Sequence, residues 1–286
     1  MKILITGARG NFATALDRRL AADNELVLYD LEPMADPEKG ISVQADIRDA
    51  GALTHAMRGC DAVIHSAAYN AQSAELRNDE DYFGVNVTGT HNVLRAMLLN
   101  DVKYLVYSSS EDVYGDGMRG RQVVDETVPC VPTATHAMTK LLGEDMCRFY
   151  SRKHAFKVAI LRYGCFLSTD WRTSGIGRLN NWLDRDDVAQ ANELALGAVV
   201  AEAFSCETFL IHCQKPFVNE DWPDLVTDPK SVIDRYYPGA SDLLAEHGMS
   251  IPLVHHRYDI RKAATWLGYD PQHNFEQFLA AVKRGH

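Results

Sequence analysis

The sequence predicts an α/β fold in which a parallel sheet is doubly wound by helices. Short apolar runs alternate with longer segments of helical periodicity through residues 1–162, and this alternation is typical of parallel βαβ units. In addition, glycines, small residues and polar side chains directly follow these runs. Ligands bind at the carboxyl ends of the strands in sheets of this kind. We therefore expect the functional residues along that edge of the sheet.

Length and composition allow a large core and exclude some partners. A chain of 286 residues can form a single α/β domain or a main domain that carries a smaller lobe. Its 46% hydrophobic and 24% charged residues are ordinary for a globular protein. The formal net charge of −10 would repel both a phosphate backbone and an anionic membrane surface. We expect neither nucleic acid nor a membrane as a partner.

The cysteines indicate a reducing compartment. None of the six belongs to a C-x-x-C pair, so neither a zinc site nor a disulfide framework is predicted, and we expect no metal. Reduced cysteines are typical of the cytoplasm, where we place the protein. The first strand begins directly after Met1, which leaves no room for a signal peptide. No apolar run approaches the roughly 20 residues of a membrane span.

The first element is an apolar strand at residues 2–5, followed by a turn and a helical pattern over residues 14–22. A glycine turn between a strand and a helix gathers backbone N–H groups and the positive end of the helix dipole at one point. A pyrophosphate binds at such a point. We therefore expect cofactor contacts from the turn, through Gly7, Arg9, Gly10, Asn11 and Phe12.

A second apolar run, residues 25–29, ends at Asp30. An acidic residue at this distance from a glycine turn accepts hydrogen bonds from the adenosine ribose. The glycines alone could form only a tight turn, and Asp30 could be only a turn residue, but the whole pattern indicates a dinucleotide site. The Asp30 carboxylate would repel a 2′-phosphate, which favours NAD over NADP. Nearby Arg9 is the one feature that could reverse this preference.

Two more strands are predicted at residues 41–45 and 61–65. Asp46 and Ile47 follow the first, and we expect the Asp46 side chain and the Ile47 backbone to face the adenine. Alternatively, Asp46 caps a helix that begins near Asp49. Small residues follow the second strand and would let a flat cofactor approach the backbone closely. These residues are Ser66, Ala67 and Ala68.

Two long helices and two strands complete the main domain. An apolar stripe predicts a helix over residues 79–100, from which Asn86 can hydrogen-bond to a neighbouring strand. The strand at 104–107 runs into three serines, 108–110. In the helix over residues 133–153, His136 and Lys140 are four residues apart and share a face. The strand at 157–161 ends at Arg162.

Beyond residue 162 the spacing becomes irregular. We expect a loop over 166–178, a helix over 188–204, a short strand at 208–212, and helices over 258–267 and 275–282. The stretch 214–241 is rich in turns, and no internal repeat is present.

Taken together, these motifs resemble the extended short-chain dehydrogenase/reductase family of NAD-dependent sugar epimerases and dehydratases. The matching residues are 6–10, Asp30, 46–47, 65–68, 86–90, 108–115 and 140–144, with fragments at 259–263 and 267–269. The resemblance implies a Rossmann-type NAD-binding domain at residues 1–162. It also implies a small substrate-binding lobe at 163–286 that is interleaved with the sheet. Asn86, Ser108, Tyr163 and Cys165 would then line the cofactor site.

The sequence departs from this family at the position of greatest importance. Its members carry a Tyr-x-x-x-Lys pair whose tyrosine exchanges a proton with the substrate hydroxyl. Here the same register reads His136-Ala137-Met138-Thr139-Lys140. A neutral imidazole could itself act as the general base, since it titrates near neutrality. Alternatively, His136 is a remnant in a site that no longer transfers hydride.

The resemblance assigns two further roles in catalysis. Ser110 would hold the substrate oxygen, although it could also be only a strand-capping serine. Lys140 would bond the nicotinamide ribose whether or not His136 is a base. We regard Cys165 as a packing residue rather than a nucleophile, since no base in the sequence is paired with it.

Residues 178–188 look like the matching stretch of uronate dehydrogenases, which oxidise a sugar acid at C1. In these relatives an arginine at the position of Arg178 grips the substrate carboxylate, for which a guanidinium is well suited. The preceding loop is longer here, so Arg172 could take this role instead. Either arginine could equally be a surface residue.

The interpretation that we favour is an NAD-dependent oxidoreductase or epimerase that acts on a hydroxyl of a sugar, sugar acid or related polyol. The alternatives are an NAD-binding regulatory protein with a degenerate site and a dehydratase or lyase that retains its NAD. The resemblance further implies a homodimer formed through the helices at 79–100 and 133–153.

Overall fold

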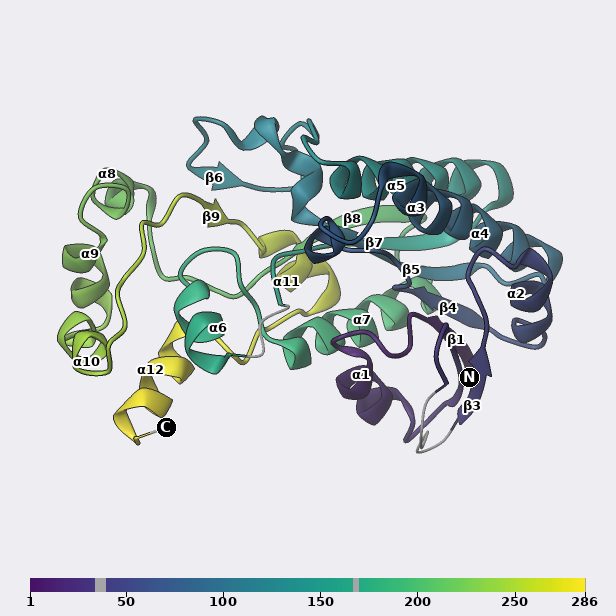
Figure 1. The fold of residues 1–286 in the computed structure, drawn as a ribbon, viewed down its shortest axis with the longest axis horizontal. Coiled ribbons are helices and arrows are strands. Elements are labelled where there is room, and N and C mark those ends of the chain that lie inside the picture. The colour runs from purple at the N-terminus through teal and green to yellow at the C-terminus, as the bar shows by residue number, and fades with distance from the viewer. Residues whose placement is uncertain (34–39, 167–169, 286) are drawn as a thin grey trace.

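Seven parallel strands form the centre of the molecule. The computed structural model describes residues 1–33, 40–166 and 170–285. The strands lie in the order β3-β2-β1-β4-β5-β7-β8, and every neighbouring pair is parallel (Figure 1). Their bounds are β1 Lys2–Thr6, β2 Glu25–Asp30, β3 Gly40–Gln44, β4 Ala62–His65, β5 Tyr104–Ser110, β7 Lys157–Tyr163 and β8 Cys206–Ile211. The predicted doubly wound parallel sheet is confirmed.

The strand order reverses between β1 and β4. From β1 the chain adds β2 and β3 on one side, and it then returns to place β4, β5, β7 and β8 on the other. Connections that leave a sheet in opposite directions open a crevice at the carboxyl ends of the two central strands. The glycine turn follows β1 and the small residues 66–68 follow β4, so both segments lie at this crevice.

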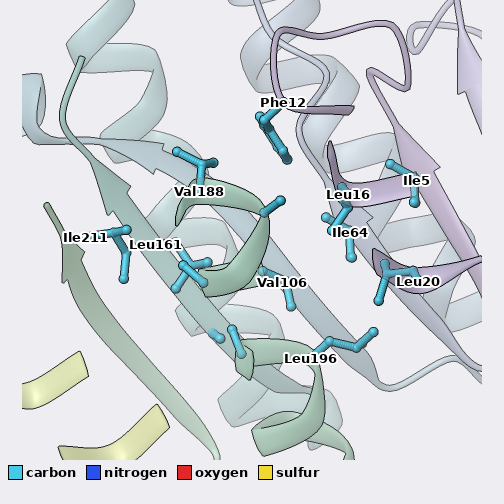
Figure 2. Packing of buried hydrophobic residues seen from close by; sticks show 14 of the residues in the cluster. Ile5, Phe12, Leu16, Leu20, Ile64, Val106, Leu161, Val188, Leu196 and Ile211 are labelled. Atoms are coloured by element: carbon cyan, nitrogen blue, oxygen red, sulfur yellow. The ribbon is translucent and has the colours of Figure 1, made fainter. Parts of the chain in front are cut away.

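One face of the sheet is covered by helices from distant parts of the chain. These are α1 Ala13–Leu20, α7 Arg185–Val200 and α11 Arg261–Leu267. Alternate strand residues such as Ile5, Ile64 and Leu161 pack there against Leu16 and Val188 (Figure 2). All five side chains are buried, with at most 2% of their surface exposed. This packing places α1, and with it the glycine turn, rigidly against the sheet.

The opposite face is covered by α2 Ala50–Ala56, α4 Gly89–Leu99 and α5 Thr135–His154. The intervening strand residues, among them Leu4, Val63 and Leu105, pack there against Leu53 and Leu94. The helix predicted over 79–100 is confirmed. It begins as α3 Asp79–Tyr82, passes through a π-helical segment at Phe83–Thr88 and continues as α4. Asn86 lies in the π-helical segment, and such segments frequently mark functional sites.

A second lobe, seen at the left of Figure 1, has a core of its own. It consists of short helices, and its core includes Leu179, Phe217, Val232, Leu244 and Phe278. A two-stranded sheet of β6 and β9 joins the segment after β5 to the tail. The bounds are α6 Trp171–Gly177, α8 Trp222–Leu225, α9 Pro229–Tyr236, α10 Ala240–Glu246, α12 Phe275–Lys283, β6 Val123–Val124 and β9 Arg257–Tyr258.

Two sequence expectations in this region were wrong. The loop predicted over 166–178 contains helix α6, whose first turn is capped by the Asp170 carboxylate through the N–H groups of Arg172 and Thr173. Residues 167–169 of that loop lie outside the described part of the chain. The helix predicted over 258–267 begins only at Arg261, because the preceding Arg257 and Tyr258 pair with β6.

The small lobe is not one continuous segment. Tyr163 is the last residue of β7, and the chain then forms α6 before α7 and β8 return it to the sheet. Only after β8 does it form α8, α9 and α10. The chain therefore passes between the sheet and the small lobe several times. These connections hold the lobe beyond the carboxyl ends of β7 and β8. In the described part of the chain, no helix is both long and apolar enough to cross a membrane.

Candidate active site

The glycine turn lies against the chain that leaves β4. The backbone N–H groups of Gly7 and Ala8 donate to Tyr29 O, at 2.9 and 3.4 Å. Gly7 has φ +71°, and a Cβ atom there would lie 2.7 Å from Ala67 N. Only glycine combines this conformation with such a close approach. The turn is thus shaped for contact between its backbone and a ligand in the crevice.

Asp30 supports the turn from the end of β2. Its carboxylate accepts hydrogen bonds from the N–H of Arg9 at 2.9 Å and of Glu32 at 3.3 Å. The guanidinium of Arg9 is paired with Glu32, whose carboxylate lies 2.5 Å from Nη1. The charge of Arg9 is therefore already neutralised by a neighbouring acid. Two carboxylates and one guanidinium give this corner a net negative charge, which opposes a 2′-phosphate.

A cavity of about 280 Å³ lies next to this turn. Its lining includes the predicted adenine-side residues Asp46 and Ile47 together with Asp30. The alternative that Asp46 caps the next helix is wrong, because Asp49 caps it through the N–H groups of Gly51 and Ala52. Asp46 instead pairs with Arg48, and this hydrogen bond lowers the pKa of the Asp46 carboxyl despite partial burial. Asp46 thus stays ionised at the mouth of the cavity.

A second cavity, of about 340 Å³, continues along the strand ends. It shares Gly10, Ser66 and Ala68 with the first, so the two cavities adjoin at the glycine turn. We call it the inner cavity. Its lining brings together most of the remaining predicted site residues. These are Asn11, Phe12, Ser108, Ser110, His136, Lys140, Tyr163 and Cys165.

Asn86 holds the wall between the cavities in place. Its side-chain amide accepts from Tyr69 N at 2.8 Å and donates to Tyr69 O at 3.0 Å. The same amide donates to Thr139 Oγ1, which in turn donates to His136 O. The side chain is 1% exposed and is occupied by these bonds. Asn86 therefore positions the chain after β4 and the first turn of α5, and the cross-strand bond predicted for it is replaced by these contacts.

Lys140 is buried behind the inner cavity. Only 4% of the residue is exposed, and Nζ lies 4.7 Å from the centre of the Tyr107 ring. Burial lowers the pKa of Lys140 to about 8. Its ammonium group is thus held by a π-face rather than by a carboxylate. This leaves its N–H donors available to a ligand in the cavity.

His136 and Ser110 face the inner cavity from two different elements. His136 belongs to the first turn of α5, and its side chain is 9% exposed. Its Nδ1 lies 3.4 Å from Asp112 Oδ2, and its ring packs near Tyr82 with 6.4 Å between centroids. Ser110 ends β5, and its Oγ accepts a hydrogen bond from Asp112 N at 3.1 Å. The Ser110 hydroxyl also bonds to the Asp112 carboxylate, which helps to lower the pKa of that carboxyl.

A buried ion-pair network fastens the elements that carry these side chains. Glu144, on α5, is fully buried and accepts from Ser109 Oγ of β5 at 2.6 Å. It also pairs with Arg162 of β7 at 2.7 and 2.8 Å and with Arg148 at 2.6 Å. Burial would raise the pKa of Glu144, but the bonds from these partners lower it overall. These bonds fix the positions of strand β5, helix α5 and strand β7 relative to one another.

An aromatic wall closes the inner cavity on the side of α1. Phe12, Tyr163 and Phe166 have ring centroids 5.9–6.3 Å apart. Tyr163 OH is bonded to Asn192 of α7 at 2.8 Å. The backbone of Cys165 bonds to Asn181 O and to Leu183 N, at 2.8 Å each. Tyr163 and Cys165 therefore lie together at one end of the cavity.

The structure does not bring Arg178 to this site. Its guanidinium donates to Asp184 Oδ2 at 2.9 Å and to Asn274 O at 3.4 Å, and it lines neither the inner cavity nor the cleft that contains Arg172. A paired and largely buried guanidinium cannot also hold a ligand in the inner cavity. The carboxylate-gripping role expected of Arg178 is corrected accordingly. Arg172 is exposed and lines a separate open cleft of about 770 Å³.

Sequence reasoning missed the residues that connect this outer cleft with the inner cavity. Asn181 lines both, and its side chain donates to Glu111 Oε1. Glu111 is 4% exposed and its other oxygen lies 3.2 Å from His212 Nε2. The His212 ring is stacked on Tyr258 at 3.9 Å. Glu111 and Asp112 stand beside the predicted Ser110, but only the folded chain shows that they face the cavity with His136.

One further group of titratable side chains lies at a separate cavity of about 380 Å³, which Arg178, Asp184 and His273 help to line. Asp184, Asp186 and His273 could offer three ligand atoms within 4.8 Å of one another. Asp184 is already paired with Arg178, and His273 Nδ1 lies 3.2 Å from Asp187. These pairings account for the group, and we assign no metal to it.

Comparison with known proteins agrees with this geometry. Residues 3–175 match the model of the NAD dependent epimerase/dehydratase family. The matched segment contains the glycine turn, Asp30, the serine run and the His136-to-Lys140 register.

The chain belongs to this family.

Two characterised relatives are dehydrogenases of sugars. The chain is 32% identical over 182 residues to L-arabinose 1-dehydrogenase (NAD(P)(+)) of Haloferax volcanii, which covers 59% of this chain and 68% of that protein. It is 28% identical over 199 residues to uronate dehydrogenase of Pseudomonas putida, which covers 68% and 71%. UDP-glucose 4-epimerases also match, at 30% identity for that of Lactobacillus helveticus, over 57% of this chain and 51% of that protein.

Solved structures show the same fold. A short-chain dehydrogenase/reductase superfamily protein of Agrobacterium tumefaciens with bound NAD superposes with TM-score 0.76 at 21% identity, covering 99% of this chain and 97% of that one. Uronate dehydrogenase of the same organism gives TM-score 0.71 at 20% identity, covering 100% and 89%.

The residues of this chain fit NAD, the cofactor of its family. The backbone cradle at Gly7 would be filled by a Cβ atom, and the acidic corner at Asp30 suits ribose hydroxyls. The buried Lys140 carries donors that no carboxylate of the described chain occupies. Two adjoining cavities along the strand ends match the extended shape of a dinucleotide.

Proposed function

We propose that this protein is an NAD-dependent oxidoreductase or epimerase acting on a hydroxyl group of a sugar, a sugar acid or a related polyol. One observation carries the proposal. A titratable base, a hydroxyl donor and a buried ammonium group line one cavity that adjoins the glycine turn, and they are His136, Ser110 and Lys140. The carbohydrate relatives support the substrate class.

The bound cofactor would extend through both cavities, and different residues would hold each of its parts. The turn residues Gly7, Arg9, Gly10, Asn11 and Phe12 would hold the pyrophosphate, and Asp30, Asp46 and Ile47 the adenosine. Ser66, Ala67, Ala68 and Ser108 would border the central part. Lys140 would bond the nicotinamide ribose, with Tyr163 and Cys165 at the nicotinamide end. NAD, when bound there, accepts a hydride from the carbon that carries the reacting hydroxyl.

His136 and Ser110 would handle the hydroxyl itself. Ser110 lines the inner cavity, and its hydroxyl would turn from the Asp112 carboxylate to donate to the substrate oxygen and orient it. His136 Nε2 takes the hydroxyl proton as the C–H bond is broken and the carbon–oxygen double bond forms. An imidazole is shorter than a phenol, so the substrate lies deeper than it would beside a tyrosine.

The charges around the inner cavity restrict the substrate. Glu111 and Asp112 line it beside the reacting position, and Lys140 is the cation among its described lining residues. Two carboxylates disfavour a substrate carboxylate next to the reacting carbon. Neighbouring hydroxyl groups, in contrast, can donate to Glu111. A carboxylate at the far end of a sugar acid could extend through the Asn181 junction toward Arg172 in the outer cleft.

The test is a panel of aldoses, uronic acids, polyols and 2-hydroxy acids with NAD, followed by NADH absorbance. We expect at least one sugar or sugar acid to be oxidised and the 2-hydroxy acids to be inert. His136→Gln should lower kcat by about 10²-fold or more while the NAD dissociation constant is unchanged. If no compound reduces NAD, and His136→Tyr gives turnover on one, His136 is not the proposed base.

A second candidate function is favoured by the missing tyrosine. The protein could keep its dinucleotide site for binding or regulation without redox turnover. Calorimetry would then show micromolar binding of NAD or NADH, with no catalysis across the panel. Weak binding of both nucleotides would exclude this candidate. Purified protein that already carries NAD would instead indicate an epimerase, dehydratase or lyase that recycles its cofactor.

We also propose that the protein is a cytoplasmic homodimer. All six cysteines are free, which suits a reducing compartment. Large apolar side chains are exposed on the two helices expected to pair, including Phe83, Leu99, Met138 and Phe149. Light scattering should give twice the monomer mass of 31.9 kDa. Phe149→Glu should produce monomers, whereas Trp266→Glu, on the distant α11, should not.

A further inference from the structure

A carboxylate to which the sequence analysis assigns no role, that of Asp112, lies against the proposed base. Asp112 is in the 3₁₀ turn Glu111–Tyr114 that follows β5, and His136 is 24 residues further along the chain, in α5. Their side chains meet at 3.4 Å between Asp112 Oδ2 and His136 Nδ1. The contact joins the two elements that supply Ser110 and Lys140 to the inner cavity.

The burial of the Nδ1 atom of His136 makes this contact directional. Nδ1 of His136 is shielded from solvent and is not hydrogen-bonded to any described residue within ordinary bonding distance. Asp112 Oδ2 is the acceptor that lies nearest to it. The Asp112 backbone is itself fixed, because its N–H donates to Ser110 Oγ at 3.1 Å. With Nδ1 directed at Asp112, Nε2 is the nitrogen left for a ligand in the inner cavity.

We propose that Asp112 is a positioning residue that holds the proton of neutral His136 on Nδ1 and thereby presents the lone pair of Nε2 to the substrate. This inference rests on the proposed function of His136 and deepens it. A carboxylate beside one ring nitrogen selects the tautomer that is protonated there. The same carboxylate stabilises the imidazolium that forms when Nε2 takes the substrate proton. Asp112 does not itself accept that proton.

The other groups around His136 explain why such a partner is needed. The Lys140 ammonium, from the same helix, shares the inner cavity and disfavours an imidazolium. Tyr82 of α3 contacts the ring but is uncharged, and Asp79 of α3 is bonded to the neighbouring Thr135 hydroxyl. Asp112 is therefore the acid that faces the imidazole directly. The close approach of the His136 imidazole is the main reason that the pKa of Asp112 is lowered.

The tautomer can be measured without knowledge of the substrate. In protein labelled with ¹⁵N at histidine, imidazole shifts report which nitrogen carries the proton, and loss of one signal set in His136→Gln assigns His136. We expect the Nδ1–H form in the NAD-free protein and in its NAD complex. In Asp112→Asn the Nε2–H form should become populated, because a carboxylate beside Nδ1 no longer selects the Nδ1–H tautomer.

Asp116→Asn is the matched control. Asp116 is also acidic and stands four residues later, but its carboxylate pairs with the exposed Arg119. This variant should leave the tautomer of His136 as in the wild type. A predominant Nε2–H form in the wild type would overturn the proposal, as would equal tautomer populations in the Asp112→Asn and Asp116→Asn proteins. The wild-type measurement decides the matter even if Asp112→Asn does not fold.

Steady-state kinetics with a sugar that the protein oxidises provide the second readout. Asp112→Asn should lower kcat by about 10- to 100-fold, leave the KM for NAD unchanged, and move the acid limb of kcat/KM to lower pH. A merely structural carboxylate would not move that limb. The two proposals fail separately. An Nδ1–H tautomer in a protein that oxidises no sugar would refute only the function, and an Nε2–H tautomer in an active enzyme would refute only the role of Asp112.

Discussion

The two ends of the crevice are built in different ways. The cavity beside the glycine turn is lined mainly by residues that end or directly follow a strand, and a buried sheet fixes where each strand ends. The outer cleft beside the small lobe is lined by residues of short helices and turns, which are held by contacts with distant segments. Asn180, for example, is bonded to Leu253 O and to His255 N. The cavity at the glycine turn is thus a property of local chain geometry, whereas the outer cleft depends on long-range packing.

The largest effect that we expect concerns the glycine turn. Gly7→Ala forces a Cβ atom to within 2.7 Å of Ala67 N at a positive φ. We expect NAD affinity to fall more than 100-fold and the free energy of unfolding to decrease by about 2–4 kcal/mol. Calorimetry with NAD and denaturant titration measure both quantities.

Gly120→Ala is the control for this prediction. Gly120 has nearly the same φ, +69°, but a Cβ atom there meets nothing within 4 Å. It should cost about 1 kcal/mol of backbone strain and leave NAD affinity intact. Equal losses of NAD affinity in the two variants would show that the close approach at Ala67 does not matter.

The next effect concerns the ion-pair network beneath the site. Glu144→Gln leaves the buried Arg162 without its carboxylate and should lower the free energy of unfolding by about 3–5 kcal/mol. Because the native pKa of Glu144 lies below its unfolded value, the pair stabilises the fold above the unfolded pKa. This stability is lost as the pH falls through the lower native pKa.

Urea titrations between pH 3 and 7 should therefore show that the wild type loses its advantage over Glu144→Gln at the acid end. Asp145→Asn is the control, since Asp145 is exposed and pairs only with Arg148. It should change stability by less than about 1 kcal/mol. A pH-independent difference between Glu144→Gln and the wild type would contradict the ionised state of Glu144.

A smaller effect separates the two acids at the end of β2. Asp30→Asn should weaken NAD binding by about 10-fold, because a charge-assisted bond to the ribose is lost. Glu32→Gln should leave NAD binding nearly unchanged and improve binding of NADP, since it releases the Arg9 guanidinium. The ratio of the two dissociation constants measures the effect. An unchanged ratio in Glu32→Gln would show that the Arg9–Glu32 pair has no part in cofactor choice.

The smallest effect tests the substrate lobe. Arg172→Ala should raise the KM for a uronic acid by about 3- to 10-fold relative to the matching neutral hexose, because Arg172 is exposed in the outer cleft. Arg178→Ala should lower the melting temperature and leave that ratio unchanged, because Arg178 is paired with Asp184. Selective loss of the uronic acid in Arg178→Ala would restore the role that its sequence position first indicated.

Much of the fold and of the cofactor site could be predicted because the responsible signals are local. The strands before Gly7, Asp30 and Ser66 were found from short apolar runs, and their order in the sheet brings these residues to one edge. The substrate lobe was predicted less well. A glycine-containing segment, 171–177, was expected to be a loop, but the Asp170 cap and packing of Gly175 against the Phe278 ring stabilise it as α6.

Residue identity alone also left the roles of individual charges open. The sequence placed Arg178 in line with a carboxylate-binding arginine, but Asp184, six residues later, pairs with it in the fold. The sequence indicated no role for Asp112 within the serine motif, because its distance to His136 depends on how β5 and α5 pack together.

By itself the sequence determined the parallel sheet, the glycine turn, the acid at the end of β2 and the replacement of tyrosine by His136. These features follow from residues that are neighbours along the chain, whose conformations local sterics and hydrophobic periodicity decide. Only the tertiary structure decided which charges meet, since an ion pair between distant segments depends on the packing of whole elements. The contact between His136 and Asp112 and the ion pair between Arg178 and Asp184 are both of this kind.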